Sequence, residues 1–255
     1  MSKENEVNEI NFMYIRKDRL NNALRPFKFT PHIAPNALGS VLVECGHTKV
    51  ICAASFEEKI PAWMKKSGQT QSGWLSAEYA MLPYANAERK ARESSSLKKD
   101  ARSVEIQRII GRSLRAVVNL MDLAGTTLWI DCDVLQADGG TRTTSITGAY
   151  VAAQLAIKKL LEQGKLKENP FKDQVAAISV GICDGCELLD LNYIEDSQAE
   201  VDLNVVMSGQ NKFIEIQGTA ERNPFSKEQL DHLLQLAQSG IEQIFRLQQD
   251  VLNKH

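Results

Sequence analysis

The order of apolar and polar residues predicts strands early in the chain and a long helix after them. Residues 39–44 and 48–55 are rich in β-branched side chains and flank Gly46, which predicts a hairpin. From Ser103 onward, apolar residues recur at intervals of three and four, as on the buried face of a helix. Gly125 is a residue type that commonly ends a helix, so we expect a helix from Ser103 to Gly125.

The second half of the chain repeats this alternation of strands and helices. Residues 128–136 alternate between apolar and polar side chains, which predicts a strand. A helical apolar stripe follows from about residue 143 to Gly164, and four β-like runs lie between residues 174 and 219. Ser226 and Gln229 form a capping box before a last amphipathic helix. Strands clustered between long helices predict an α+β fold with mixed or antiparallel sheets.

Length and composition fit a globular protein that folds without covalent cross-links. The chain has 255 residues, of which 43% are hydrophobic, enough to bury a sizeable core. Residues 1–13 are expected to form a mobile tail without the basic and apolar regions of a secretory signal, and no apolar run is long enough to cross a membrane. We therefore expect a cytoplasmic protein that does not bind membranes.

The five cysteines predict reduced, mostly buried thiols. They are odd in number and lie mostly in apolar, strand-like runs, where a thiol acts as a small hydrophobic group. Cys183 and Cys186 form a C-x-x-C sequence, but the Asp-Gly between them is typical of a hairpin turn. No histidine pair lies near them, so a hairpin is favoured over a metal or redox site.

Positive charge is concentrated in one segment of an otherwise acidic chain. The net charge is −2, yet residues 86–115 contain nine Lys and Arg against four Asp and Glu, a balance of +5. A local polyanion site needs such a concentration of charge. The charge pattern alone favours the simpler interpretation, a solvated basic helix face.

A strand, a glycine turn and a helix start meet around residues 137–145, Ala-Asp-Gly-Gly-Thr-Arg-Thr-Thr-Ser. Two glycines allow a tight turn, and free amides at a helix N-terminus attract a compact oxyanion such as phosphate. The forked guanidinium of Arg142 adds charge-assisted hydrogen bonds. An ordinary turn with a threonine N-cap fits this segment equally well.

The other candidate chemistry is a group of carboxylates between residues 194 and 204. In an extended chain, Glu200, Asp202 and Asn204 share one face, and Asp196 lies just upstream. These oxygens could bind Mg²⁺ or handle a proton. The pattern taken alone favours the solvent-exposed side of an edge strand.

Longer blocks of sequence connect these features to a known family. They are Gly39-Ser-Val-Leu-Val-Glu44, Ala77-Glu-Tyr79, Met81-Leu-Pro83, Glu105-Ile-Gln-Arg108, the thirteen residues from Asp131 to Thr143, Ser145-Ile-Thr-Gly148, Glu195-Asp-Ser197, Asp202-Leu-Asn-Val-Val-Met207 and Gln217-Gly-Thr-Ala-Glu221. Together they strongly resemble the bacterial ribonuclease PH family. The resemblance spans residues 24–250, a single catalytic unit with approximate halves 24–165 and 172–250.

The resemblance implies a fold, an activity and a set of residues. The fold would be that of ribonuclease PH, which is like domain 2 of ribosomal protein S5. The activity would be phosphate-dependent 3′→5′ trimming of RNA, above all of transfer RNA precursors, with release of nucleoside diphosphates. The residues matching the family's phosphate ligands are Arg102, Gly140, Thr141 and Arg142. Those matching its catalytic and metal-binding aspartates are Asp196 and Asp202.

The resemblance further implies that Arg89 and Arg92 guide the RNA end, that Mg²⁺ or Mn²⁺ assists, and that the protein forms a homohexamer, a trimer of dimers. RNA, not DNA, would be the partner. The family usually has an arginine where this chain has Tyr84. Two other hypotheses are a non-catalytic RNA-binding subunit of an exosome-like ring and, more weakly, a small-molecule kinase of related fold, for which no ATP-binding glycine loop is present.

Overall fold

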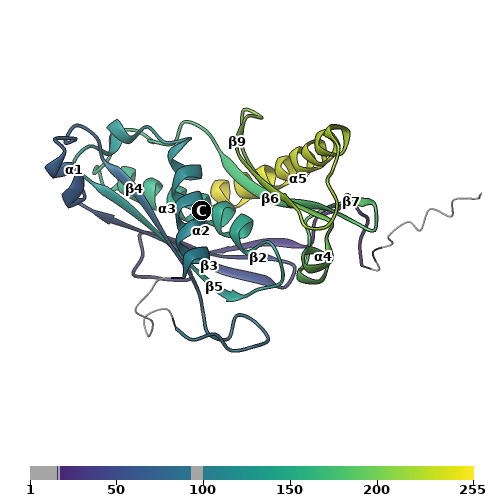
Figure 1. Ribbon diagram of the computed structural model, residues 1–255. Coiled ribbons are helices and arrows are strands. Elements are labelled where there is room, and N and C mark those ends of the chain that lie inside the picture. The colour runs from purple at the N-terminus through teal and green to yellow at the C-terminus, as the bar shows by residue number, and fades with distance from the viewer. Residues whose placement is uncertain (1–15, 17, 93–99) are drawn as a thin grey trace, which may run out of the picture.

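The computed structural model describes residue 16, residues 18–92 and residues 100–255, which form an α+β fold with two sheets (Figure 1). The first sheet has five strands in the order β1-β2-β3-β5-β4, antiparallel except for the parallel pair β4–β5. Its strands are β1 (Phe27–Pro31), β2 (Gly39–Cys45), β3 (Thr48–Glu57), β4 (Trp74–Met81) and β5 (Thr127–Gln136).

The second sheet has four antiparallel strands in the order β7-β6-β8-β9. These strands are β6 (Val175–Cys183), β7 (Cys186–Leu189), β8 (Val201–Ser208) and β9 (Phe213–Ala220). The helices are α1 (Ala62–Lys66), α2 (Ala101–Arg115), the short 3₁₀ helix η2 (Leu120–Leu123), α3 (Thr141–Glu162), α4 (Tyr193–Gln198) and α5 (Lys227–Lys254).

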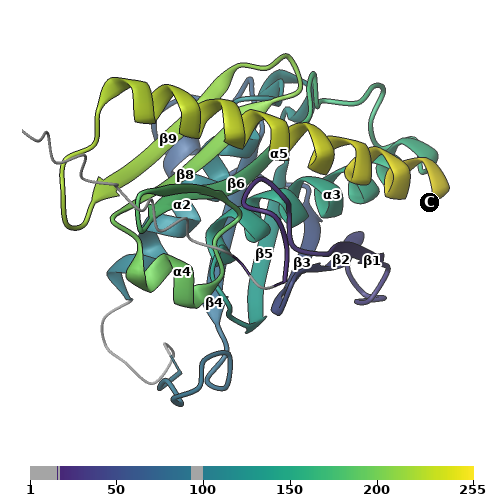
Figure 2. The same ribbon diagram turned by 90° about the vertical axis from the view of Figure 1, so that its right-hand side faces the viewer.

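Helix α3 lies at the centre of the fold because it packs against both sheets. It contacts β2 and β3 of the first sheet and β6 of the second. A helix covered on several sides needs small or apolar residues all round, and α3 supplies them with Ala149, Ala152, Ala153 and Ala156, all fully buried. Helix α5 covers the other face of the second sheet (Figure 2). The N-terminus of α3 is thereby fixed where the two sheets meet.

Strand β6 packs against α3 on one face and against α5 on the other. All nine of its residues are buried. Ala177 belongs to the apolar cluster around α3, whereas its neighbour Ile178 belongs to the cluster under α5. Because side chains alternate along a strand, a strand covered on both faces has a continuous apolar sequence.

Most predicted elements are confirmed. The hairpin around Gly46, the strand over residues 128–136 and the last helix with its capping box are all present. Gly46 has a φ of +56°. Cys183 and Cys186 pair across a two-residue turn, and all five cysteines are free thiols.

Two predictions are wrong in their details. The helix predicted from Ser103 to Gly125 ends at Arg115, because the chain turns at Val118, which bridges to Phe171, and continues as η2. In this irregular segment Val117 and Leu123 are buried in the core, whereas Met121 is exposed. Among the strands predicted between residues 174 and 219, residues 193–198 form helix α4, which the sequence pattern did not predict.

The predicted tail at residues 1–13 lies outside the described residues, as do residues 93–99 of the basic segment. Residues 67–73 connect α1 to β4. None of the helices in the described part of the chain is both long and apolar enough to span a membrane.

Candidate active site

The glycine turn after β5 leads directly into α3. Gly139 and Gly140 have φ values of +71° and +67°, a conformation that other residues rarely adopt. A Cβ on Gly139 would lie 2.6 Å from the backbone oxygen of Leu191, so the turn also needs glycine for its close approach to the segment before α4. Gly140 is the N-cap of α3 and no side chain caps the helix. The first amides of α3 are therefore open to an anion.

The turn is held by buried polar groups. The Thr48 hydroxyl donates to the carbonyl oxygen of Gly139 at 2.7 Å and accepts from the amide of Asp138 at 2.9 Å. Arg25 donates from Nη1 to the carbonyl oxygen of Asp138. Because Thr48 is fully buried and Arg25 nearly so, the backbone of the anion site is fixed before any ligand binds.

Two arginines lie in the first turns of helices α2 and α3, beside this glycine turn. Arg102 is the second residue of α2, is exposed, and makes no hydrogen bond or ion pair with any other described residue. Arg142 lies in the first turn of α3, where its Nη1 donates to Oε1 of Gln217 and lies 3.8 Å from Oε1 of Glu105. Its Nε and Nη2 have no partner among the described residues, so they are available to an oxyanion.

Thr141 is positioned from the opposite side. Its hydroxyl accepts a hydrogen bond of 3.0 Å from Tyr79, a buried residue of β4. Thr143 does not cap the helix: its hydroxyl donates to the carbonyl oxygen of Gly140 at 2.9 Å. The alternative of a turn closed by a threonine N-cap is therefore wrong, and the helix start remains uncapped by side chains.

The two predicted aspartates lie on different elements that meet at the same cavity. Asp196 is on α4 and Asp202 is on β8. Partial burial raises the pKa of Asp196, while the nearby Arg102 and Arg142 oppose the rise. Burial, and then the Asp196 carboxylate, raise the pKa of Asp202. Neighbouring carboxylates with raised pKa values are suited to hold a proton or a divalent cation.

Glu200, which we grouped with these aspartates, does not line the cavity. Its Oε1 accepts a hydrogen bond of 3.0 Å from the amide of Gly185 in the β6–β7 turn. It directly precedes β8, whose Asp202 and Asn204 do line the cavity. Two of these three residues, Asp202 and Asn204, therefore reach the cavity.

Helix α4, although short, is firmly placed. Asn192 and Glu195 form a capping box in which each side chain accepts from the other residue's amide. Glu195 is buried and bidentate with Arg16, at 2.7 Å and 2.8 Å, and it also pairs with Arg19 at 3.1 Å. This cluster fixes the backbone next to Asp196.

One cavity of about 770 Å³ brings most of the predicted site together. Its walls include Arg89, Arg102, Gly140, Thr141, Arg142, Asp196 and Asp202. Arg92 follows on the exposed loop and does not line it. The volume lies in the range of small-molecule sites.

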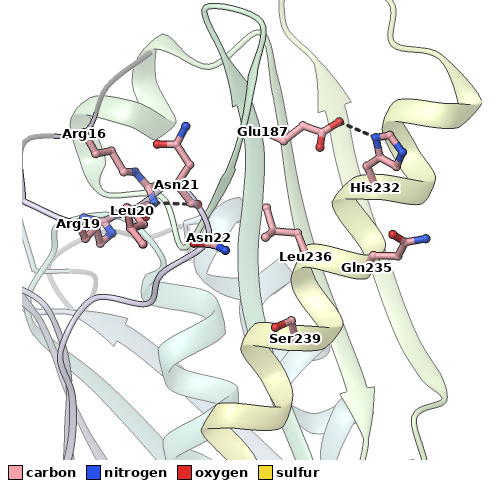
Figure 3. A pocket seen from close by; sticks show the side chains of 10 residues that line it. All are labelled: Arg16, Arg19, Leu20, Asn21, Asn22, Glu187, His232, Gln235, Leu236 and Ser239. Atoms are coloured by element: carbon pink, nitrogen blue, oxygen red, sulfur yellow. Dashed lines mark hydrogen bonds and ion pairs between the residues drawn. The ribbon is translucent and has the colours of Figure 1, made fainter. Parts of the chain in front are cut away.

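A second cavity of about 790 Å³ lies between Arg16, residues 19–22, β7 and α5 (Figure 3). None of the predicted site residues lines it. Its guanidinium groups are engaged with Glu195, and Nδ1 of His232 lies 3.3 Å from Oε1 of Glu187. Although slightly larger, it lacks the combination of two arginines, an open helix start and two aspartates that lines the first cavity.

Four polar or aromatic residues of the first cavity were not predicted from the sequence: Asn86, Glu88, Lys90 and Tyr193. Lys90 entered the prediction only as part of the positive charge of residues 86–115. Tyr193 lies three residues before Asp196 on α4. The spacing of Asn192 and Glu195 is that of a capping box, so this helix start could have been recognised.

The cavity's oxygen ligands fit a small divalent cation. Among the described residues, no group of three or more His, Cys, Asp or Glu side chains is arranged around a metal. Mg²⁺, however, is commonly bound by one or two carboxylates together with water and substrate phosphates. Asp196 and Asp202, whose proximity raises the pKa of Asp202, meet that requirement.

Two family models match the chain. The first 3′ exoribonuclease domain matches residues 23–158 and the second matches residues 173–240. Ribonuclease PH of Neisseria meningitidis is 52% identical over 240 residues, covering 94% of this chain and 98% of the relative. Ribonuclease PH of Syntrophomonas wolfei is 54% identical over 236 residues, covering 92% and 98%.

The fold is also that of a solved structure described as the Archaeoglobus fulgidus exosome with RNA bound to the active site. The TM-score is 0.73 at 20% identity, with 89% of this chain and 90% of that chain covered. At this identity the similarity concerns the fold alone.

Proposed function

The chain belongs to the ribonuclease PH family of phosphorolytic 3′ exoribonucleases, and from this premise we propose that its cavity uses inorganic phosphate to trim transfer RNA precursors. One observation carries the proposal. Two arginines, an uncapped helix start and two aspartates line the same cavity, although they come from four different elements. This is the set that phosphorolysis requires.

Phosphate binds at the N-terminus of α3. The amides of the first turn and the free nitrogens of Arg142 donate to its oxygens, and Arg102 approaches from the start of α2. The aspartates lie beside this position, and the RNA 3′ end places its last phosphodiester between phosphate and aspartates. The bound phosphate is thereby in line for attack.

In the reaction, an oxygen of inorganic phosphate forms a bond to the phosphorus of the last phosphodiester. The bond from that phosphorus to the 3′ oxygen of the preceding ribose breaks. Arg142 and Arg102 stabilise the charge on the remaining phosphoryl oxygens. When no cation is bound to the aspartates, Asp202, whose pKa is raised, donates the proton that the leaving 3′ oxygen takes up. The products are a nucleoside diphosphate and an RNA shorter by one nucleotide.

Asp196 and Asp202 would hold Mg²⁺ or Mn²⁺, which neutralises phosphoryl charge when bound. Such a cation offsets the repulsion between the two carboxylates, and this repulsion is part of what raises the pKa of Asp202. The aspartates themselves orient the terminal nucleotide against the anion site.

RNA reaches the cavity past the loop that follows β4. Arg89 lines the cavity on this loop, and Arg92 extends the positive charge outward from it. Tyr84, exposed on the same loop, presents an aromatic ring beside the path of the strand. The local charge balance of +5 over residues 86–115 supports this route for a polyanion.

The same family resemblance supports a homohexamer built as a trimer of dimers, acting in the cytoplasm. Sedimentation of the purified protein tests the assembly: a six-subunit mass is expected, and a stable monomer would contradict it. The alternative of a non-catalytic RNA-binding subunit is not favoured, because the arginines and aspartates are together in one cavity.

A trimming assay tests the proposal. The protein is incubated with a transfer RNA that carries a 3′ tail, with and without inorganic phosphate, and the released nucleotides are separated. Phosphate-dependent release of nucleoside diphosphates is expected, with tail extension when nucleoside diphosphate is in excess. Release of monophosphates without phosphate would contradict phosphorolysis.

A further inference from the structure

The cavity wall formed by α4 carries one aromatic side chain that neither the phosphate site nor the aspartates use. Tyr193 is the first residue of α4 and 63% exposed. Among the described residues that line the cavity, it is the one aromatic side chain. Its ring is therefore mostly outside the core and lines the space where the proposed function places the RNA end.

The backbone that carries this ring is anchored at both ends of the first helical turn. The amide of Tyr193 donates to Oδ1 of Asp138 at 3.2 Å, which ties it to the glycine turn of the phosphate site. Glu195, two residues on, is buried and paired with Arg16 at 2.7 Å. An exposed ring on a fixed backbone loses little conformational freedom when a planar group lies on it.

The position of Tyr193 relative to the aspartates follows from helix geometry. Tyr193 and Asp196 are three residues apart on α4, and side chains with this spacing lie next to each other on one helix face. A nucleotide whose phosphodiester lies at Asp196 therefore has its base within reach of the ring. Every base has a π face, so stacking of this kind does not depend on base identity.

On the basis of the proposed function, we propose that Tyr193 is a stacking surface for the base at the RNA 3′ end, and that it raises affinity for any terminal nucleotide. The helix that carries Asp196 then also fixes the base. This arrangement lets the enzyme remove successive nucleotides of different identity.

The test combines a side-chain change with a substrate change. Tyr193→Ala should raise the KM for a tailed RNA roughly 5-fold or more, leaving the KM for phosphate unchanged. Tyr193→Phe should behave as the unmodified enzyme, because it keeps the ring. Ile194→Ala is the matched control, since Ile194 is the neighbouring residue, equally exposed at 62%, and does not line the cavity.

A substrate whose last nucleotide lacks its base provides the second arm. The unmodified enzyme should bind it less tightly than the complete RNA, whereas Tyr193→Ala should bind both alike. Unchanged RNA KM in Tyr193→Ala, or an equal effect in Ile194→Ala, would overturn the stacking role alone. Absence of phosphate-dependent trimming by the unmodified enzyme would instead contradict the proposed function.

Discussion

Arg25 and Asp190, which are 165 residues apart in the chain, form a buried bidentate ion pair between the two halves of the fold. Nε of Arg25 donates to Oδ2 of Asp190 at 3.0 Å and Nη2 donates to Oδ1 at 2.7 Å. The amide of Arg25 also donates to Oδ2, at 2.8 Å. Since Arg25 also bonds to the carbonyl of Asp138, this pair links the segment before α4 to the phosphate turn.

Removing one member of this pair should destabilise the protein strongly. Asp190→Ala leaves the Arg25 guanidinium buried without its counter-charge, which typically costs about 3–5 kcal/mol. Urea unfolding of the purified variant measures the loss. Lys28→Ala is the control, because Lys28 is exposed and lies 3.7 Å from Glu44, so its loss should cost less than about 1 kcal/mol. Equal effects in the two variants would contradict the role assigned to burial.

The same pair predicts a pH dependence of stability. Burial alone would raise the pKa of Asp190, but Arg25 more than offsets this, so the pKa lies below its usual value. A carboxyl whose pKa is lowered by folding contributes stability above its unfolded pKa of about 3.9 and loses it as pH falls through the folded value. The difference in unfolding free energy between the native protein and Asp190→Asn should therefore be constant near neutrality and shrink below about pH 4. A difference that instead grows below that pH would contradict a lowered pKa of Asp190 in the folded protein.

Arg142→Ala should remove most phosphorolysis without unfolding the protein. Its guanidinium is the charged donor of the phosphate site, and the residue sits in the first turn of α3, not in a core. A charge-assisted contact of this kind is worth roughly 1.5–3 kcal/mol, which is about a 10- to 150-fold loss of rate below phosphate saturation. RNA binding should survive, as a filter-binding assay would show. Near-normal trimming by the folded variant would refute the site.

Much of this site could be predicted from the sequence because its parts are local. The glycine turn, the helix start and Arg142 are consecutive, so their chemistry follows from neighbouring residues. Asp202 and Asn204 alternate along one strand and do share a face. Glu200 does not line the cavity, because its carboxylate is held by the amide of Gly185 in the β6–β7 turn.

The long-range parts could not be derived in this way. Nothing in the local pattern brings Arg25 to Asp190 or Arg16 to Glu195, since these pairs depend on how the two sheets meet around α3. Helix periodicity likewise failed beyond Arg115, where apolar residues with helical spacing continue in a bent segment. The two ion pairs and the end of this helix are determined by tertiary packing, which local sequence patterns do not reveal.

Asp196→Asn and Asp202→Asn should abolish turnover and yet leave the protein as stable or more stable near neutral pH. Folding raises both pKa values, so the ionised forms carry a cost above the folded pKa that vanishes below the unfolded pKa. Neutral asparagine removes this cost. Stability is followed by thermal unfolding between pH 4 and 8, where any gain should shrink toward the acid end. Variants that lose stability but keep their rate would show that the carboxylates form a structural strand face.

The basic loop should account for much of the salt dependence of RNA binding. Each phosphate contact on a single strand contributes roughly −0.7 to the slope of log affinity against log salt, so replacing both Arg89 and Arg92 by alanine should flatten it by about one unit or more. Arg89 lines the cavity and Arg92 lies on the exposed loop beyond it, so the single Arg89→Ala variant should also weaken trimming.

Two positively charged residues far from the cavity provide the control for the Arg89 and Arg92 double variant. Lys158 and Lys159 are exposed near the other end of α3, about 25 Å along the helix from Thr141, so their replacement by alanine should leave the slope unchanged. Tyr84→Arg, which adds a cation to the basic loop, should steepen it. If the Arg89 and Arg92 double variant bound RNA with the slope of the lysine control, the basic loop would be a solvated surface and RNA would enter by another route.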